Sequence, residues 1–199
     1  MKPIYLLDVD GVLCNFLELW CRCANKRYQL QADWKTITPW EGPYIGEEFG
    51  LSKEEDAQVW RDLKQPGVIY DADPIEGAPA FVRQLSNLGD VYFVTAKIDE
   101  GAWMSDRVRW VKDHVRFDVR AEARSEENVI FATAHTKKLV YGNMFIDDKP
   151  GTVQAWTAFW KERAAPYTPL YGYQPNGTPP WDALLKIAEE VKALTDGRR

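Results

Sequence analysis

The sequence contains few of the residues that bind transition metals or form disulfide bonds. Its 199 residues include three Cys and two His. Cys14, Cys21 and Cys23 lie close together in an odd number and without a Cys-x-x-Cys spacing, and His114 and His135 are far from them in the chain. This pattern argues against a zinc site and against a disulfide framework. We therefore expect free thiols in a reducing compartment.

An excess of positive charge and a long hydrophobic run are also absent. The 25 Lys and Arg against 30 Asp and Glu give a formal net charge of -5, which argues against a dedicated binder of nucleic acid or of anionic membranes. The first apolar run, residues 4–7, ends at Asp8 and Asp10 and is too short and too acidic for a signal peptide or a membrane span. We expect a cytoplasmic protein without a membrane partner. A local cluster of Lys and metal could still hold a small anionic substrate.

Short apolar runs alternate with segments of helical periodicity along the chain. Ser52 and Glu55 have the spacing of a capping box at the start of one helix. The patterns predict strands at residues 4–7, 91–94, 128–131 and 144–146, and helices at residues 12–28, 52–63, 78–88, 105–114 and 181–194. This alternation predicts an α/β fold with a Rossmann-like, mainly parallel sheet and helices on both faces.

The segment between the first two strands is too long for a simple crossover connection. It contains two of the predicted helices and a stretch rich in Pro, Gly and aromatic residues. We therefore predict a small helical cap at residues 16–73, inserted after the first strand. Residues 1–15 and 74–199 would then form the core domain.

Polar residues follow three of the predicted strands at the point where each ends. Asp8 and Asp10 follow the first strand, Thr95 the second, and Asp147 and Asp148 the fourth. Because the carboxyl ends of parallel strands share one edge of a sheet, we expect these side chains to converge. Several carboxylates in one cleft repel one another unless a cation lies among them. Oxygen ligands of this kind predict a Mg2+ site.

Hydrolysis of a phosphate ester would use each of these groups. One carboxylate can attack phosphorus and form an acyl phosphate, which divides one difficult step into two easier ones. A second carboxylate can protonate the leaving oxygen and later activate water. A hydroxyl group and a Lys can bind the oxygens of the transferred group, and the metal ion reduces the repulsion between the two anions.

Four motifs resemble those of the haloacid-dehalogenase superfamily of phosphatases, in the same order. They are Asp8-Val9-Asp10-Gly11-Val12-Leu13, Thr95 after the second strand, Lys137, and Phe145-Ile146-Asp147-Asp148-Lys149-Pro150. Within that superfamily the chain is most similar to the 5'(3')-deoxyribonucleotidases. The similarity extends to the turn Pro74-Ile75-Glu76-Gly77-Ala78, to Thr95-Ala96-Lys97-Ile98 with the later Arg109-Trp110-Val111, and to Trp181-Asp182.

The resemblance implies a role for each of these residues. Asp8 would be the nucleophile and Asp10 the general acid and base, while Thr95 and Lys137 would hold the phosphoryl oxygens. Asp8, the backbone carbonyl of Asp10 and one of Asp147 and Asp148 would bind Mg2+, and Asp148 is favoured as the direct ligand. The substrate-binding residues that it implies are Phe16, Trp40, Trp60, Thr95, Ala96, Lys97, His135 and Lys137.

Two of these positions depart from the family. Ala96 stands where Ser is common, and His135 stands where a basic Arg is frequent. The chemistry survives both changes, but the nucleotide preference does not follow from the resemblance. Base preference, 5' against 3' selectivity, deoxy against ribo selectivity and the oligomeric state, a homodimer included, are undecided.

Other interpretations compete with this one. The substrate could be a sugar phosphate or a nucleic-acid 3'-phosphate, an acceptor other than water could take the phosphate, or the fold could bind nucleotides without catalysis. Phe16, Trp40 and Trp60 could be core residues as easily as a wall for a nucleobase. Lys138 is the alternative to Lys137. We assign Trp103 and Trp110 to packing, and we expect Arg107, Arg109 and Lys112 to form a solvated helix face.

Overall fold

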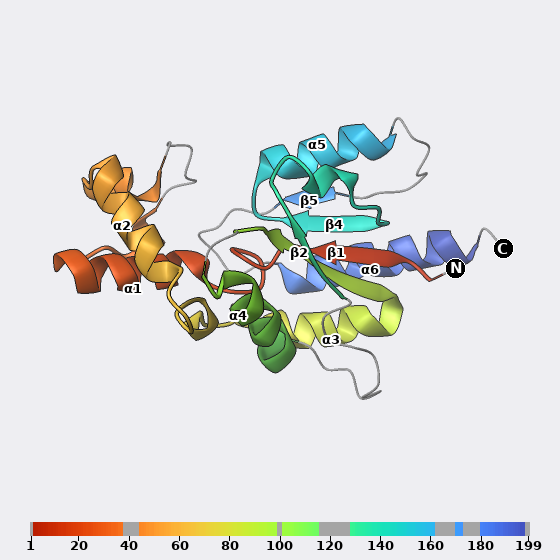
Figure 1. Ribbon diagram of the computed structural model, residues 1–199. Coiled ribbons are helices and arrows are strands. Elements are labelled where there is room, and N and C mark those ends of the chain that lie inside the picture. Colours follow the sequence, from red (N-terminus) through yellow and green to blue (C-terminus); the bar gives the residue numbers. More distant parts are fainter. Residues whose placement is uncertain are drawn as a thin grey trace.

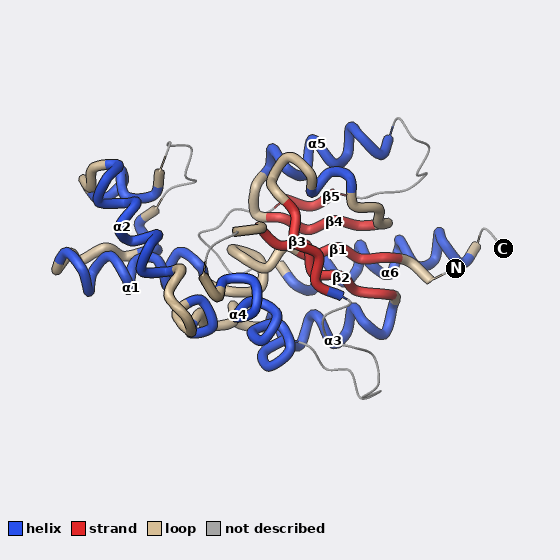
Figure 2. Tube along the Cα trace, viewed as in Figure 1, coloured by secondary structure: helices blue, strands red, loops and turns tan. Residues whose placement is uncertain are grey.

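A computed structural model describes residues 2–37, 44–98, 101–115, 128–161, 170–172 and 180–197. Its centre is a parallel sheet in which the strands have the order β3-β2-β1-β4-β5. The strands are β1 (Ile4–Leu7), β2 (Asp90–Ala96), β3 (Val129–Ala132), β4 (Met144–Asp147) and β5 (Leu170–Gly172). Figure 2 shows them side by side with their carboxyl ends at one edge. The predicted α/β fold is confirmed.

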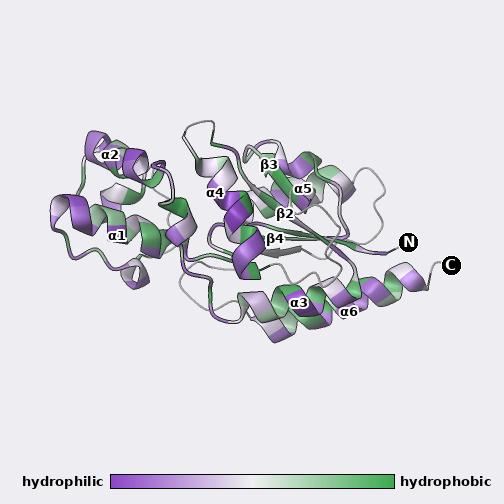
Figure 3. Cartoon of the chain, turned by 60° about the horizontal axis from the view of Figure 1, so that its bottom comes forward, coloured by the Kyte–Doolittle hydropathy of each residue, from purple (hydrophilic) through white to green (hydrophobic). Residues whose placement is uncertain are grey.

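Helices cover both faces of this sheet. The helices of the core are α3 (Ala78–Leu88), α4 (Trp103–Trp110), α5 (Pro150–Lys161) and α6 (Trp181–Asp196), and α4 continues into the π-helical turn η4 (Val111–Val115). Figure 1 shows α5 on one face of the sheet and α3 and α6 on the other, and Figure 3 shows α3 beside α6.

The side chains of β1 alternate between the two faces, as the pleat of a strand requires. Tyr5 and Leu7 belong to the large core that also contains Phe81 of α3 and Leu184 of α6. Leu6 belongs to the smaller core beneath α5, with Phe145 and Trp156 among its other members. This burial on both faces explains why the predicted strands are continuous apolar runs.

The long segment after β1 forms the helices α1 (Phe16–Tyr28) and α2 (Lys53–Leu63), with the short turns η1 (Trp34–Thr36), η2 (Ile45–Phe49) and η3 (Ile69–Asp71). Figure 1 shows α1 and α2 beyond the carboxyl ends of the strands. The capping box at Ser52 and Glu55 is present, with both hydrogen bonds made. The predicted start of the first helix was wrong: Asn15 caps α1 through Glu18 N, so Val12 lies in the preceding turn.

In the described part of the chain, the sequence patterns did not predict the helix α5 or the strand β5. Pro150-Gly151 resembles a turn in sequence, but Pro is well suited to the first position of a helix. Leu170–Gly172 is a three-residue strand that follows Pro169 and ends in Gly, which is a composition typical of loops. None of the helices in the described ranges is both long enough and apolar enough to span a lipid bilayer.

Candidate active site

Strands β1 and β4 bring the predicted carboxylates together. Leu7 pairs with Ile146, and Asp8 N donates a hydrogen bond to Ile146 O over 2.8 Å, so Asp8 lies beside the end of β4. Asp8, Asp147 and Asp148 each offer a carboxylate oxygen, and these oxygens lie within 4.8 Å of one another. The expected convergence at the carboxyl edge of the sheet is therefore present for these three carboxylates.

The turn after β1 lets Asp148 approach closely. Gly11 has a φ of +74°, in the left-handed region that favours Gly. A Cβ atom at this position would collide with the Asp148 carboxylate. Leu13 N and Cys14 N both donate to Val9 O, at 2.9 and 3.0 Å, which closes the turn. Gly11 is thus required both by the backbone and by the neighbouring acid.

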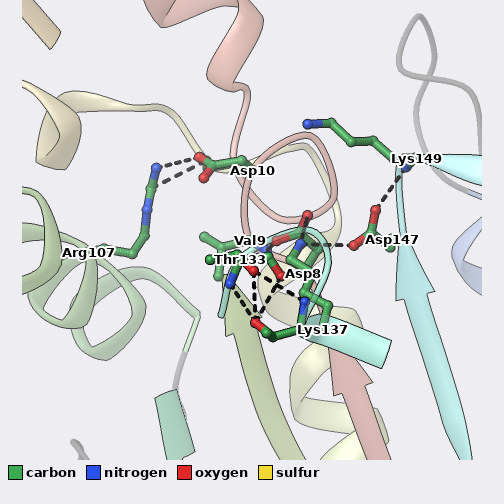
Figure 4. A network of polar contacts seen from close by, with 10 residues as sticks. Asp8, Val9, Asp10, Arg107, Thr133, Lys137, Asp147 and Lys149 are labelled. Carbon is green, nitrogen blue, oxygen red and sulfur yellow. Dashed lines mark hydrogen bonds and ion pairs between the residues drawn. The ribbon is translucent and has the colours of Figure 1, made fainter. Parts of the chain in front are cut away.

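Lys137 lies between two of the carboxylates, as Figure 4 shows for Asp8. Its Nζ is 2.6 Å from Asp8 Oδ2 and 2.8 Å from Asp147 Oδ2. A turn delivers it, in which Lys137 N donates to Thr133 O over 2.9 Å, just before η6 (Lys137–Leu139). Burial opposes the charge on Lys137, but the carboxylates of Asp8 and Asp147 outweigh burial and raise its pKa above the ordinary value.

The two adjacent acids after β4 differ in their partners. Asp147 is fully buried, and its oxygens accept from Lys137 Nζ (2.8 Å) and from Lys149 N (2.9 Å). Asp148 Oδ1 is buried without a hydrogen-bond partner among the described residues. All three acids are close enough to share a cation. Of these three acids, Asp148 is the one with a buried oxygen that has no partner in the described part of the chain.

The electrostatics of the cluster also fit a cation. Burial raises the pKa of Asp148 to about 7, and the negative charge of Asp147 adds to this effect. Burial raises the pKa of Asp8 well above its ordinary value; Lys137 opposes this rise, while Asp147 and Asp148 add to it. Three carboxylates thus lie together, and Lys137 pairs with those of Asp8 and Asp147; a divalent cation would relieve their repulsion. The residues fit the Mg2+ that the sequence predicts.

The hydroxyl group of Thr95 lies near the end of β2, which Asp90–Ala96 form next to β1. Thr95 is fully buried, and its Oγ1 has no hydrogen-bond partner among the described residues. A buried hydroxyl without a partner is costly, which suggests a ligand group at this position. Of the neighbouring predicted residues, Ala96 is half-buried, and Lys97 and His135 are exposed.

Asp10 points toward α4 rather than toward Lys137 (Figure 4). Arg107 Nη2 donates to its Oδ1, and so does Cys14 Sγ over 3.4 Å. The expectation of a solvated helix face was wrong for Arg107, which is 0% exposed. A signal was present in the sequence: Trp103, Arg107 and Trp110 have the spacing of one helix face, and both Trp are buried.

Phe16 and Trp60, two of the predicted substrate-binding residues, form an aromatic cluster with Trp103 of α4. The Phe16 ring lies 5.5 Å from that of Trp60 and 6.2 Å from that of Trp103, between ring centroids. Phe16 is 9% exposed, Trp60 is half-buried and Trp103 is 2% exposed. The assignment of Trp103 and Trp110 to packing is confirmed. Trp40 lies outside the described residues.

Comparison with known proteins gives a consistent result. A family model described as "5' nucleotidase, deoxy (Pyrimidine), cytosolic type C protein" matches residues 2–160. The human 5'(3')-deoxyribonucleotidase, cytosolic type, is 27% identical over 158 residues, which cover 72% of this chain and 69% of the human protein.

Two solved structures share the fold. A hydrolase from Streptococcus pneumoniae TIGR4 has a TM-score of 0.54 at 14% identity, over 95% of this chain and 100% of that one. A haloacid dehalogenase-like family hydrolase from Xanthomonas campestris has a TM-score of 0.54 at 10% identity, over 100% of this chain and 95% of that one. These likenesses concern the fold alone.

Proposed function

Because the chain belongs to the cytosolic type C family of 5'-nucleotidases and is a phosphatase of the 5'(3')-deoxyribonucleotidase type, we propose that it hydrolyses deoxynucleoside monophosphates through an aspartyl phosphate on Asp8, with Mg2+ as cofactor. One observation carries this proposal. The buried carboxylate of Asp8 pairs with Lys137 over 2.6 Å and lies within 4.8 Å of Asp148. We extend the proposal to a cytoplasmic location, which the name of the human relative favours.

Asp8 is the proposed nucleophile. Val9 N donates to its Oδ1 over 2.7 Å and Lys137 holds its Oδ2, so the carboxylate has a fixed orientation. In the first step a bond forms between an Asp8 oxygen and phosphorus, and the bond from phosphorus to the nucleoside oxygen breaks. In the second step water attacks phosphorus, which releases inorganic phosphate and regenerates the Asp8 carboxylate.

Asp10, Thr95 and Lys137 assist these steps in the proposed mechanism. Asp10 gives a proton to the leaving oxygen and later takes one from the attacking water. The Thr95 hydroxyl and the Lys137 ammonium bind the phosphoryl oxygens as negative charge develops on them. The Oγ1 of Thr95, which has no hydrogen-bond partner in the described ranges, supports this role.

Asp8, Asp148 and the backbone carbonyl of Asp10 would hold Mg2+. The ion, when bound, neutralises charge on the phosphoryl group and polarises it. In this proposal Asp147 is a positioning residue, because its oxygens already hold Lys137 and the Lys149 backbone. The choice between the two acids thus follows from their hydrogen bonds.

Addition of Mg2+ should raise the melting temperature, and more at pH 8 than at pH 5. A carboxyl group whose pKa is raised by folding, here that of Asp148 to about 7, stabilises the fold at low pH, and this contribution is lost as the pH rises toward 7. Protons compete with the ion at pH 5, whereas at pH 8 the ion relieves repulsion between charged acids. At a Mg2+ concentration about a hundred times Kd, the free energy of unfolding should rise by about 2.7 kcal/mol. The melting temperature should then rise by roughly 5–10 °C.

Thermal melts with Mg2+ or with a chelator at both pH values measure this effect. Asp148→Asn should remove most of the Mg2+ response and flatten the pH dependence. Asp182→Asn, at the start of α6, is a matched change outside the cluster and should preserve both. An equal Mg2+ response in Asp148→Asn and the unmodified protein would contradict the proposed site.

A panel of phosphomonoesters tests the substrate class. Stacking of a nucleobase on aromatic side chains is worth about 1–3 kcal/mol, so deoxynucleoside monophosphates should exceed deoxyribose 5-phosphate in kcat/KM by roughly 5- to 150-fold. The family description favours pyrimidine bases. Phosphate release is the measurement. Equal turnover of the sugar phosphate would contradict the nucleotide preference, and binding without release would favour a non-catalytic nucleotide-binding protein.

Trp60→Leu tests whether the aromatic cluster binds the base. Trp60 is half-buried and packs on Phe16, so we expect a loss of nucleotide kcat/KM of about 5-fold or more, with little change for deoxyribose 5-phosphate. Trp160→Leu is the matched control, because Trp160 is a partly buried residue of α5 that packs against the smaller core. Equal losses on both substrates would assign Trp60 to packing.

A further inference from the structure

Arg107 is a buried cation that the proposed mechanism does not use. Its side chain is 0% exposed, whereas that of Asp10 is 20% exposed. Arg107 Nη2 donates to Asp10 Oδ1, and Arg107 Nη1 donates to Cys14 Sγ over 3.4 Å. Figure 4 shows the guanidinium reaching Asp10 from α4, on the side of Asp10 away from Lys137.

The helix that carries Arg107 is firmly anchored. The guanidinium carbon lies 5.6 Å from the Trp103 ring and 5.8 Å from the Trp110 ring. Trp110 Nε1 donates to Ala72 O over 2.6 Å, and Gly67 N donates to the Asp106 carboxylate over 2.6 Å. These bonds tie α4 to the chain that leaves α2. The guanidinium therefore has little freedom to move away from Asp10.

Burial of a guanidinium is costly unless its partner repays the lost hydration. An apolar side chain between Trp103 and Trp110 would fill the same space without that cost. The Asp10 carboxylate offsets the cost of burying Arg107. Its Oδ1 accepts hydrogen bonds from both Arg107 and Cys14. This arrangement fixes one oxygen of a side chain that would otherwise rotate at the edge of the site.

We propose that Arg107 is a positioning residue that holds the Asp10 carboxylate in place for proton transfer to the leaving oxygen. This inference rests on the proposed function, in which Asp10 is the general acid and base. When the phosphorus–oxygen bond breaks, its electron pair goes to the nucleoside oxygen, which takes a proton from Asp10. In the second step Asp10 takes a proton from the attacking water. Arg107 stays charged and exchanges no proton.

The dependence on the leaving group tests this inference. A nucleoside oxygen needs a proton to leave, whereas p-nitrophenolate leaves without one. In Arg107→Met, kcat on a deoxynucleoside monophosphate should fall by about 10²-fold, within the range for general acid catalysis. The first-turnover burst of p-nitrophenolate from p-nitrophenyl phosphate should change by less than about 3-fold. This leaving group does not need a proton, so its release does not depend on general acid catalysis.

Two further variants separate charge and folding from position. Arg107→Lys keeps the cation and should regain at least about 10-fold of the lost nucleotide rate. Arg109→Met is the matched control on the same helix, since the Arg109 side chain is 52% exposed, and it should retain the parental rate. Thermal melts of each full-length variant report folding. If Arg107→Met is unfolded, Arg107→Lys is used instead. Its kcat on the nucleotide should fall by a larger factor than its p-nitrophenolate burst.

A double-mutant cycle with Asp10→Asn distinguishes a positioning role from a structural one. If Arg107 acts through Asp10, Arg107→Met should cost little in the Asp10→Asn background. The inference about Arg107 would be overturned if Arg107→Met lowered kcat equally in the parent protein and in Asp10→Asn. It would also be overturned if Arg107→Met lowered the nucleotide kcat and the p-nitrophenolate burst by the same factor. Either result would leave the proposed function intact. Full activity in Asp10→Asn would instead refute the general acid of the proposed function, so the two failures are distinguishable.

Discussion

Asp8→Asn is expected to lower kcat for phosphomonoester hydrolysis by about 10⁴-fold or more, because an amide oxygen is a poor nucleophile and the covalent route is lost. The protein itself should remain folded. Burial raises the pKa of Asp8, and the charges of Asp147 and Asp148 add to this, so the ionised carboxylate is unfavourable without a cation. The neutral amide removes that repulsion, and Lys137 keeps Asp147 as a partner. Without Mg2+ the variant should therefore melt no lower than the parent protein.

Phosphate release and mass spectrometry of acid-quenched protein test this expectation together. The unmodified protein should carry a phosphoryl group on Asp8 after brief exposure to substrate, and the variant should carry none. Asp90→Asn is the matched control, because the Asp90 side chain is 53% exposed and makes a surface ion pair with Lys2. Normal turnover in Asp8→Asn would refute the aspartyl-phosphate mechanism.

Lys137→Met is expected to destabilise the fold and to reduce activity. Lys137 Nζ lies 2.6 Å from Asp8 and 2.8 Å from Asp147, and both carboxylates are almost fully buried. Removal of the shared cation leaves two buried carboxylates without this counter-charge, which typically costs about 3–5 kcal/mol. For a chain of this size the melting temperature should fall by roughly 6–20 °C. In the folded variant, the loss of one phosphoryl-binding donor should also lower kcat by roughly 10²- to 10³-fold.

Calorimetric melts and single-substrate kinetics measure the two effects separately. Added Mg2+ should recover part of the stability of Lys137→Met, because it supplies a cation to the same acids, but it should not recover the activity. Lys138→Met is the matched control, since Lys138 is the adjacent half-buried residue and the alternative in the motif. If Lys138→Met shows the larger loss of activity, the assignment of Lys137 is wrong.

Local sequence patterns predicted most of the core elements. The capping box at Ser52, the helix at Ala78–Leu88 and the strand at Ile4–Leu7 depend on neighbours in sequence, and the structure has them at those positions. The helical pattern begun at Val12 was too long, because Asn15 is the cap of α1, and α5 was missed because Pro150-Gly151 resembles a turn. The strand at Leu170–Gly172 forms because it can pair with β4, which no local pattern encodes.

The candidate site divides in the same way. The order of the motifs and the position of Asp8, Thr95 and Asp148 after apolar runs follow from the sequence, because parallel strands end at one edge. The partners of each acid do not. Arg107 lies 97 residues from Asp10, and its burial depends on how α4 packs against the chain that leaves α2.

The sequence by itself determined the α/β fold, the carboxylates at its edge and the nucleotidase family, since each depends on residue type and spacing along the chain. Only the tertiary structure decided that Lys137 is shared by Asp8 and Asp147, that Asp148 has a buried oxygen with no partner among the residues described, and that Arg107 donates to Asp10. The physical reason is that hydrogen bonding and desolvation depend on which side chains meet in space. Residues of the same type, such as Arg107 and Arg109, can therefore be equivalent in a sequence pattern and still differ in charge environment and function.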